Sequence, residues 1–206
     1  MSSEQTVYVV DDNADIRDSL SLLLKSVGLD HQVYGSAAEF IDKCSPAARG
    51  CLLLDIRMPD ISGIQLQQRM KDAGFGLPVI FITGHGDVPL AVEAMKNGAM
   101  DFLQKPFSDL VLLDIIFRAL ELDRQQQDEL EQKREIEARL VTLSKRELQV
   151  MERMAIGDMT KVIASDLGIS PRTVEVHRAR IMDKMRCRTL AQLILMLTQV
   201  RNDSFG

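Results

Sequence analysis

The sequence lacks the features of several common protein classes. Its 206 residues include no tryptophan, and only 4% of them are aromatic. The three cysteines are odd in number and form no close pair, which argues against a disulfide framework or a zinc site and favours a reducing compartment. No apolar run approaches the roughly 18 residues that cross a bilayer, and no basic segment followed by an apolar one opens the chain. We therefore expect a cytoplasmic protein with no membrane partner.

Acidic and basic residues are unevenly distributed along the chain. Residues 1–120 hold 16 acidic and 10 basic side chains, and residues 121–143 hold 7 and 4. Residues 144–206 reverse the balance, with 7 acidic and 11 basic side chains. Because net charge governs which partners a surface attracts, the acidic N-terminal part and the basic C-terminal part predict two domains with different partners.

Apolar runs alternate with amphipathic stretches through residues 1–122. The runs TVYVV, HQVYG, CLLLD, LPVIFIT and DFLQKP predict five short strands. Between them, apolar side chains recur at helical spacing, as in ADIRDSLSLLLKSVG. Strands that alternate with helices form a parallel sheet covered on both faces. We therefore expect an α/β domain over residues 1–122, with a flavodoxin-like five-stranded sheet in the order 2-1-3-4-5.

The remaining 84 residues predict only helices. Residues 123–142 contain no glycine or proline and are rich in good helix formers, so they predict a helical linker. This linker is either a solvated spacer or a dimeric coiled coil. Residues 143–206 predict an all-α domain, in which two short helices joined at a glycine have the proportions of a helix-turn-helix.

Polar side chains follow four of the five predicted strands. Asp11 and Asp12 follow the first, Asp55 ends the third, Thr83 ends the fourth and Lys105 follows the fifth. In an open α/β sheet, ligands bind at the carboxyl ends of the strands, where these groups converge. Clustered carboxylates favour a hard cation such as Mg²⁺, with which one carboxylate can attack phosphorus. A hydroxyl and an ammonium group suit the charge of a transferring phosphoryl group.

Four segments, VVDDN, LLLDIRMPDISG, FITGHGD and FLQKPF, resemble the receiver domain of response regulators over about residues 5–122. The resemblance implies that Asp55 is the phosphoacceptor. It implies that Thr83 and Lys105 contact the phosphoryl group and that Thr83 and Phe102 form the switch, although Phe102 could equally be a plain core residue. The implied Mg²⁺ ligands are Asp11, Asp12, Asp55 and the backbone carbonyl of Arg57.

Residues 172–188 hold six basic side chains against two acidic ones and follow the helix-turn-helix pattern. Basic side chains neutralise phosphates, and residues near the start of the second helix reach base edges. The block SPRTVEVHRARIMDKM, within residues 141–200, resembles the C-terminal DNA-binding domain of the LuxR/FixJ type. Glu175 and Ala179 stand where relatives carry lysine, which leaves the base preference open, and packing is an alternative role for His177. The implied DNA contacts are Lys161, Arg172, Thr173, Glu175, Val176, His177, Arg178 and Ala179.

Together the two resemblances imply a two-component response regulator of the FixJ/LuxR type, similar to FixJ and the tetrathionate regulators, and not an enzyme. We expect a sensor histidine kinase to phosphorylate Asp55. A face within residues 88–120 then forms a homodimer that binds promoter DNA and contacts RNA polymerase. One alternative is a Mg²⁺-dependent aspartyl-phosphate phosphohydrolase, which Arg57 disfavours because a second carboxylate is usual there. Another is a constitutive DNA-binding protein with an inactive receiver, which the intact set of strand-end residues disfavours.

Overall fold

The computed structural model describes residues 5–84 and 88–201, which fold as two compact units that divide after Gln127. This division lies inside the predicted linker, residues 123–142. The predicted boundaries at residues 122 and 142 remain predictions, and each unit is described by itself.

The N-terminal unit contains a five-stranded parallel sheet. The strands lie in the order β2-β1-β3-β4-β5, which confirms the predicted flavodoxin-like topology. All six residues of β3, the central strand, are buried, as expected of a parallel strand that is covered on both faces. The strands are β1 (Thr6–Val10), β2 (His31–Tyr34), β3 (Gly50–Asp55), β4 (Val79–Thr83) and β5 (Asp101–Gln104).

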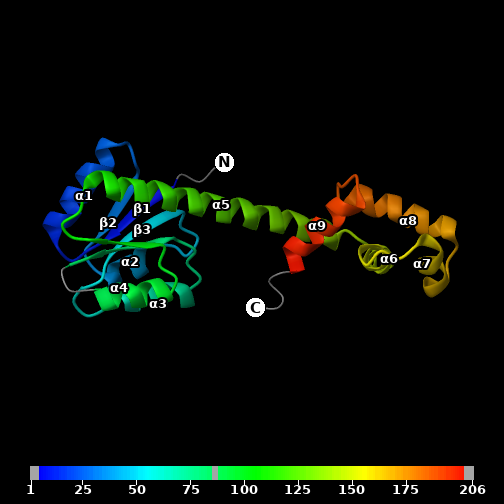
Figure 1. Cartoon of the computed structure of the whole chain (residues 1–206), viewed down its shortest axis with the longest axis horizontal. Coiled ribbons are helices and arrows are strands. Elements are labelled where there is room, and N and C mark those ends of the chain that lie inside the picture. Colours follow the sequence, from blue (N-terminus) through cyan, green and yellow to red (C-terminus); the bar gives the residue numbers. More distant parts are fainter. Residues whose placement is uncertain (1–4, 85–87, 202–206) are drawn as a thin grey trace. The chain divides into compact units, whose positions relative to one another are not determined.

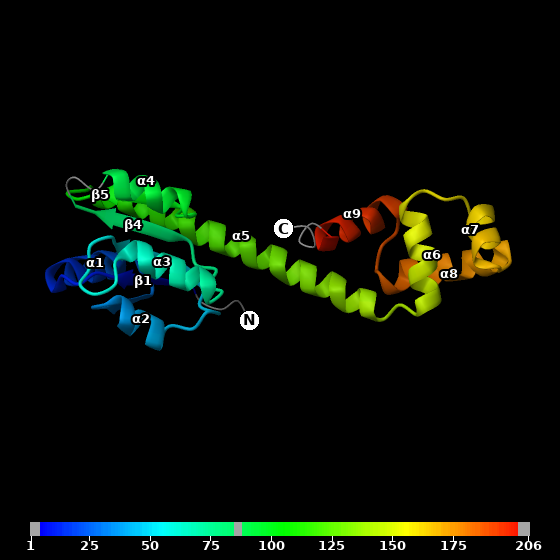
Figure 2. The same cartoon turned by 90° about the horizontal axis from the view of Figure 1, so that it is seen from below.

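Five helices connect and cover these strands. Helices α1 and α5 pack on one face of the sheet, and α2, α3 and α4 pack on the other (Figures 1 and 2). Successive side chains of β3 point to opposite faces, so Leu53 joins the α1 and α5 core while Leu52 and Leu54 join the other. Each buried leucine contributes about 1.5–3 kcal/mol to folding. The helices are α1 (Ala14–Ser26), α2 (Ala37–Lys43), α3 (Gly63–Asp72), α4 (Val88–Lys96) and α5 (Asp109–Val141).

Helix α5 contributes buried side chains to both units. Asp123 is 1% exposed and accepts hydrogen bonds from Arg49 and Gln5 of the N-terminal unit. Ile136 is 2% exposed and belongs to the core of the C-terminal unit. The segment is therefore helical, as predicted, but it is not a solvated spacer at these two positions.

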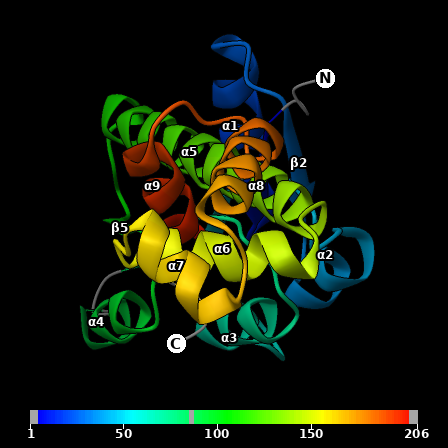
Figure 3. The same ribbon diagram turned by 90° about the vertical axis from the view of Figure 1, so that its right-hand side faces the viewer.

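The C-terminal unit packs four further helices and the end of α5 around one apolar core. Helix α8 packs against both α6 and α7, and α9 packs against α6 (Figure 3). Ser144 and Glu147 form a capping box at the start of α6. Gly168 has φ +64°, and this left-handed conformation closes α7 before the turn into α8. The helices are α6 (Lys145–Ala155), α7 (Thr160–Leu167), α8 (Pro171–Lys184) and α9 (Leu190–Arg201).

Candidate functional site

Two buried carboxylates share one ammonium group at the carboxyl end of the sheet. Nζ of Lys105 lies 2.9 Å from Asp55 Oδ1 and 2.9 Å from Asp11 Oδ2. Asp55 is 7% exposed, and its second oxygen, Oδ2, accepts a hydrogen bond of 2.7 Å from the backbone N–H of Arg57. The structure thus brings together the last residue of β3 and the residues that directly follow β1 and β5, because parallel strands end at the same edge of the sheet.

Burial is the largest single influence on the pKa of both Asp55 and Lys105, but it determines the direction only for Asp55. It raises the pKa of Asp55, and the nearby Asp11 carboxylate raises it further, against the lowering effect of hydrogen bonds from Lys105 and Arg57. Burial alone would lower the pKa of Lys105, but its hydrogen bonds to the two carboxylates and their attraction outweigh this, so that pKa is raised. Two carboxylates against one ammonium leave an excess of negative charge that favours a further cation.

The other predicted site residues are placed differently. Thr83 ends β4 and is buried, and its backbone carbonyl accepts a 2.7 Å hydrogen bond from the backbone N–H of Lys105. Asp12 is exposed. Across the described ranges 5–84 and 88–201, no three His, Cys, Asp or Glu side chains are grouped to hold a metal, and the Mg²⁺ ligands that the resemblance implies remain a prediction. Phe102 is 41% exposed on β5, which makes the alternative of a plain core residue wrong.

Three residues that the sequence did not single out support Asp11 and Asp55. The backbone N–H of Asn13 donates to Asp11 Oδ1 at 2.9 Å, and Arg17 Nη1 donates to the Asp11 carbonyl at 2.7 Å. Gly63 begins α3 directly against β3, where an added Cβ would lie 2.3 Å from the Asp55 carbonyl oxygen. Asn13 was recognisable as a helix cap after VVDD, whereas the close approach of Gly63 depends on tertiary packing.

The second candidate site is the exposed face of α8. Val174 and Ile181 are fully buried and attach the helix to its unit. Of the predicted DNA contacts, five side chains are exposed and three are half-buried. Exposed are Lys161, Arg172, Glu175, Val176 and Ala179, and half-buried are Thr173, His177 and Arg178.

Several of these side chains already have partners within the unit. Thr160 of α7 donates a 2.7 Å hydrogen bond to Glu175 Oε1, and Arg178 Nε lies 3.7 Å from Glu175 Oε2. The Thr173 hydroxyl lies 2.8 Å from the Ser170 hydroxyl at the N-cap of α8. Nδ1 of His177 is buried and has no hydrogen-bond partner among the described residues, which agrees with a packing role for part of this ring.

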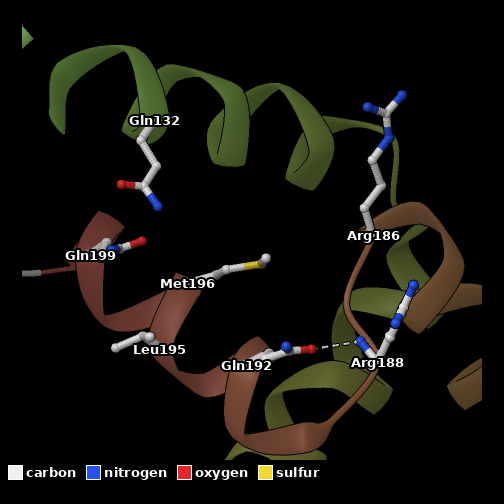
Figure 4. A pocket seen from close by; sticks show the side chains of 7 residues that line it. All are labelled: Gln132, Arg186, Arg188, Gln192, Leu195, Met196 and Gln199. Carbon is white, nitrogen blue, oxygen red and sulfur yellow. Dashed lines mark hydrogen bonds between the residues drawn. The ribbon is translucent and has the colours of Figure 1, made fainter. Parts of the chain in front are cut away.

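The C-terminal unit also contains a pocket of about 320 Å³ between the later turns of α5 and helix α9 (Figure 4). At one end of the pocket, the backbone N–H of Arg188 donates a 2.8 Å hydrogen bond to Gln192 Oε1. None of the predicted DNA contacts lines this pocket. Its lining residues are Gln132, Arg186, Arg188, Gln192, Leu195, Met196 and Gln199.

Comparison with known families decides what these sites belong to. The response regulator receiver domain matches residues 7–117, which include every residue of the carboxylate cluster. The chain belongs to the response regulators. A second family, the bacterial regulatory proteins of the luxR family, matches residues 141–197 of this response regulator and includes the whole exposed face of α8.

Relatives match this response regulator over nearly its full length. The transcriptional regulatory protein FixJ of Azorhizobium caulinodans is 46% identical over 95% of this chain and 93% of its own length. The transcriptional regulatory protein TdiR of Thauera aromatica is 43% identical over 92% of this chain and 83% of its own. The solved structure of the response regulator StyR covers 96% of this chain and 100% of its own, with 41% identity and a TM-score of 0.85.

These matches establish the class of function. The protein is a phosphorylation-regulated, two-component regulator of transcription with a receiver domain and a LuxR-type DNA-binding domain. In the part of the chain that the structure describes, no helix is both long enough and apolar enough to cross a bilayer.

Proposed function

We propose that this response regulator accepts a phosphoryl group on Asp55 from a sensor histidine kinase. The observation that carries the proposal is the shared ammonium of Lys105, which lies 2.9 Å from both the Asp55 and Asp11 carboxylates. This contact orients the Asp55 side chain at the carboxyl end of the sheet. It also places a cation where the phosphoryl oxygens would arrive, and a preorganised charge is the main aid that a protein gives to phosphoryl transfer.

The transfer exchanges one bond to phosphorus for another. An oxygen of Asp55 forms the new P–O bond, the P–N bond to the kinase histidine breaks, and the leaving imidazole keeps the electron pair. Attack by Oδ1 displaces the hydrogen bond from Lys105, and the released ammonium can then pair with a phosphoryl oxygen. Oδ2 keeps its hydrogen bond from the backbone N–H of Arg57, which holds the carboxylate plane during the step. The hydroxyl of Thr83, at the end of β4, is proposed to contact the same phosphoryl group.

The donor set around Asp55 fits Mg²⁺. All candidate ligands are oxygens, namely the carboxylates of Asp11, Asp12 and Asp55 and the backbone carbonyl of Arg57, and Mg²⁺ keeps several waters beside a few carboxylates. The two buried carboxylates, Asp11 and Asp55, carry one more negative charge than Lys105 balances, which also favours a bound cation such as Mg²⁺. When bound, Mg²⁺ would neutralise charge on the phosphoryl oxygens during transfer.

Phosphorylation is proposed to change the α4–β5–α5 face through Thr83 and Phe102. This face carries exposed apolar side chains, which typically mark an interaction surface when they gather. We propose that this face forms a homodimer, which places two copies of α8 against two half-sites in promoter DNA. The bound dimer would then recruit RNA polymerase. Within residues 88–120 the large apolar side chains that are exposed are Val92, Met95, Phe102, Leu110, Val111 and Phe117.

One experiment tests the proposal against its alternatives. The full-length protein is incubated with acetyl phosphate and Mg²⁺, and phosphoprotein, dimer mass and binding to duplex DNA are measured. We expect all three to rise for the wild-type protein and to stay at their starting values for Asp55→Asn. Asp60→Asn is the matched control, because Asp60 is an exposed residue of the same β3–α3 connection at φ +66°, a conformation that asparagine tolerates.

The other outcomes distinguish the remaining functions. Repeated release of inorganic phosphate without a lasting phosphoprotein would support a phosphohydrolase. DNA binding of equal strength with and without acetyl phosphate would support a constitutive DNA-binding protein. If Asp55→Asn behaves like the wild-type protein in all three measurements, Asp55 is not the phosphoacceptor.

A further inference from the structure

The N-terminal half of α8 carries a carboxylate on its exposed face. The side chain of Glu175 is 60% exposed and shares this face with Arg172, Val176 and Ala179. In a helix-turn-helix, residues at this end of the second helix lie against base edges in the major groove. A carboxylate is repelled by DNA phosphates and adds nothing to sequence-independent affinity, so Glu175 is suited to reading a base and not to holding the backbone.

One neighbouring side chain orients a carboxylate oxygen of Glu175. The hydroxyl of Thr160, on the neighbouring helix α7, donates a 2.7 Å hydrogen bond to Oε1. Arg178 Nε is 3.7 Å from Oε2, which is too long for a hydrogen bond. One carboxylate oxygen is therefore held by a neighbouring helix, and the other keeps its full capacity to accept a hydrogen bond from a ligand.

The chemistry of the major groove limits which base can approach this oxygen. An ionised carboxylate only accepts hydrogen bonds, so it is repelled by the N7 and O6 acceptors of guanine and by O4 of thymine. Adenine offers an amino group, but its N7 acceptor lies beside that group. Cytosine offers its N4 amino group with no acceptor on its own major-groove edge and is the base that Glu and Asp pair with in the groove.

We propose that Glu175 reads the N4 amino group of a cytosine in the operator and that Thr160 positions its carboxylate for this contact. The inference rests on the DNA-binding part of the proposed function and adds one base of the recognised sequence. A lysine at this position would donate a hydrogen bond to guanine, whereas the glutamate of this chain presents an acceptor.

The test begins with the full-length protein, phosphorylated with acetyl phosphate and Mg²⁺, which selects duplexes from a randomised pool. Binding to the selected duplex is then compared with binding to duplexes in which single C·G pairs are replaced by T·A. We expect one replacement to weaken wild-type binding about tenfold, because a carbonyl replaces the amino group. Glu175→Gln should reduce that preference to about twofold, since an amide can donate to O4 of thymine. Thr160→Val should weaken the preference while leaving the salt dependence of binding unchanged.

Asp183→Asn is the matched control, because it removes the same charge from an exposed position of the same helix. It should keep the wild-type base preference. An unchanged preference in Glu175→Gln overturns the inference while leaving DNA binding intact, and an unchanged preference in Thr160→Val overturns the positioning role. Selection of adenine at the affected position overturns the assignment to cytosine. Absence of salt-dependent binding to any duplex by the wild-type protein overturns the proposed function itself.

Discussion

We expect Glu147→Gln to weaken the C-terminal unit and to change how its stability depends on pH. Glu147 is only 3% exposed, and its Oε2 atom accepts hydrogen bonds of 2.7 Å from Lys184 and 2.8 Å from the backbone N–H of Ser144. Lys184 also donates a 3.0 Å hydrogen bond to the carbonyl of Thr142, so one ion pair connects the end of α8 with the α5–α6 junction.

The size of the effect follows from the pKa of Glu147. The hydrogen bond from Lys184 is the main cause that lowers this pKa from 4.5 to about 2, and the backbone hydrogen bond from Ser144 contributes next. Each unit of pKa corresponds to about 1.4 kcal/mol, which gives an upper value of about 3 kcal/mol. The Lys184 side chain is 36% exposed, and solvent screening reduces the contribution of such a pair. We therefore expect Glu147→Gln to cost about 1–2 kcal/mol at neutral pH.

The pH dependence has a defined sign. A carboxyl group with a lowered pKa in the folded state stabilises that state above its unfolded pKa, and the contribution is lost as the pH falls through the folded value. For Glu147 the window runs from pH 4.5 down to about pH 2. Wild type should lose stability across this window, and Glu147→Gln, which has no such proton to bind, should lose less.

The assay must report on the C-terminal unit alone. Tyrosine fluorescence does not, because both tyrosines, Tyr8 and Tyr34, lie in the N-terminal unit. Hydrogen–deuterium exchange measured on peptides from α6 and α8 does, and it should show faster exchange in Glu147→Gln at neutral pH. Glu152→Gln, on the exposed side of α6, is the control and should match the wild-type protein. Equal exchange in wild type and Glu147→Gln from pH 7 down to pH 3 would refute the reasoning.

Two further substitutions test the receiver. Gly63→Ala forces a Cβ to 2.3 Å from the Asp55 carbonyl oxygen, so we expect a loss of about 1–3 kcal/mol and slower phosphorylation of Asp55 by acetyl phosphate, measured as the rate of phosphoprotein formation. Asp123→Asn leaves Arg49, which is 19% exposed, without its charged partner and should cost about 3 kcal/mol. Tyrosine fluorescence should then show a melting temperature about 10 °C lower.

Each of these substitutions has a control within the receiver. Gly76→Ala places a Cβ in open space and should leave both stability and phosphorylation unchanged. Asp114→Asn removes a carboxylate from an exposed position of α5 and should leave the melting temperature within about 2 °C of the wild-type value. A wild-type phosphorylation rate for Gly63→Ala, or a wild-type melting temperature for Asp123→Asn, would contradict the packing described for that residue.

The sheet could be predicted from the sequence because its three inner strands, β1, β3 and β4, are buried on both faces. A strand such as β3 must then be apolar throughout, and the charged residue that ends it stands out. The same logic located Asp11, Asp55, Thr83 and Lys105, since strand ends in a parallel sheet share an edge. The luxR-family segment was predictable from its cap residues, because Ser144, Ser170 and Pro171 mark helix starts locally.

Contacts between distant segments could not be predicted in this way. Asp123 occurs in a charged, helix-forming stretch, where an acidic residue is normally solvated, and its partner Arg49 is 74 residues away. The apolar residues around Ile136 are spaced too irregularly along the helix to indicate which face of it is buried. The hydrogen bond from Thr160 to Glu175 likewise joins two helices through side chains that are individually unremarkable in the sequence.

The division of α5 between the two units has a practical consequence for separating them. A receiver that is cut at residue 122 loses Asp123 and leaves Arg49 without its partner. A DNA-binding fragment that begins at residue 143 loses Ile136 and exposes the core that this side chain covers. Independent domains should therefore be produced by cutting after Gln127, where each fragment keeps the turns of the helix that complete its own interior.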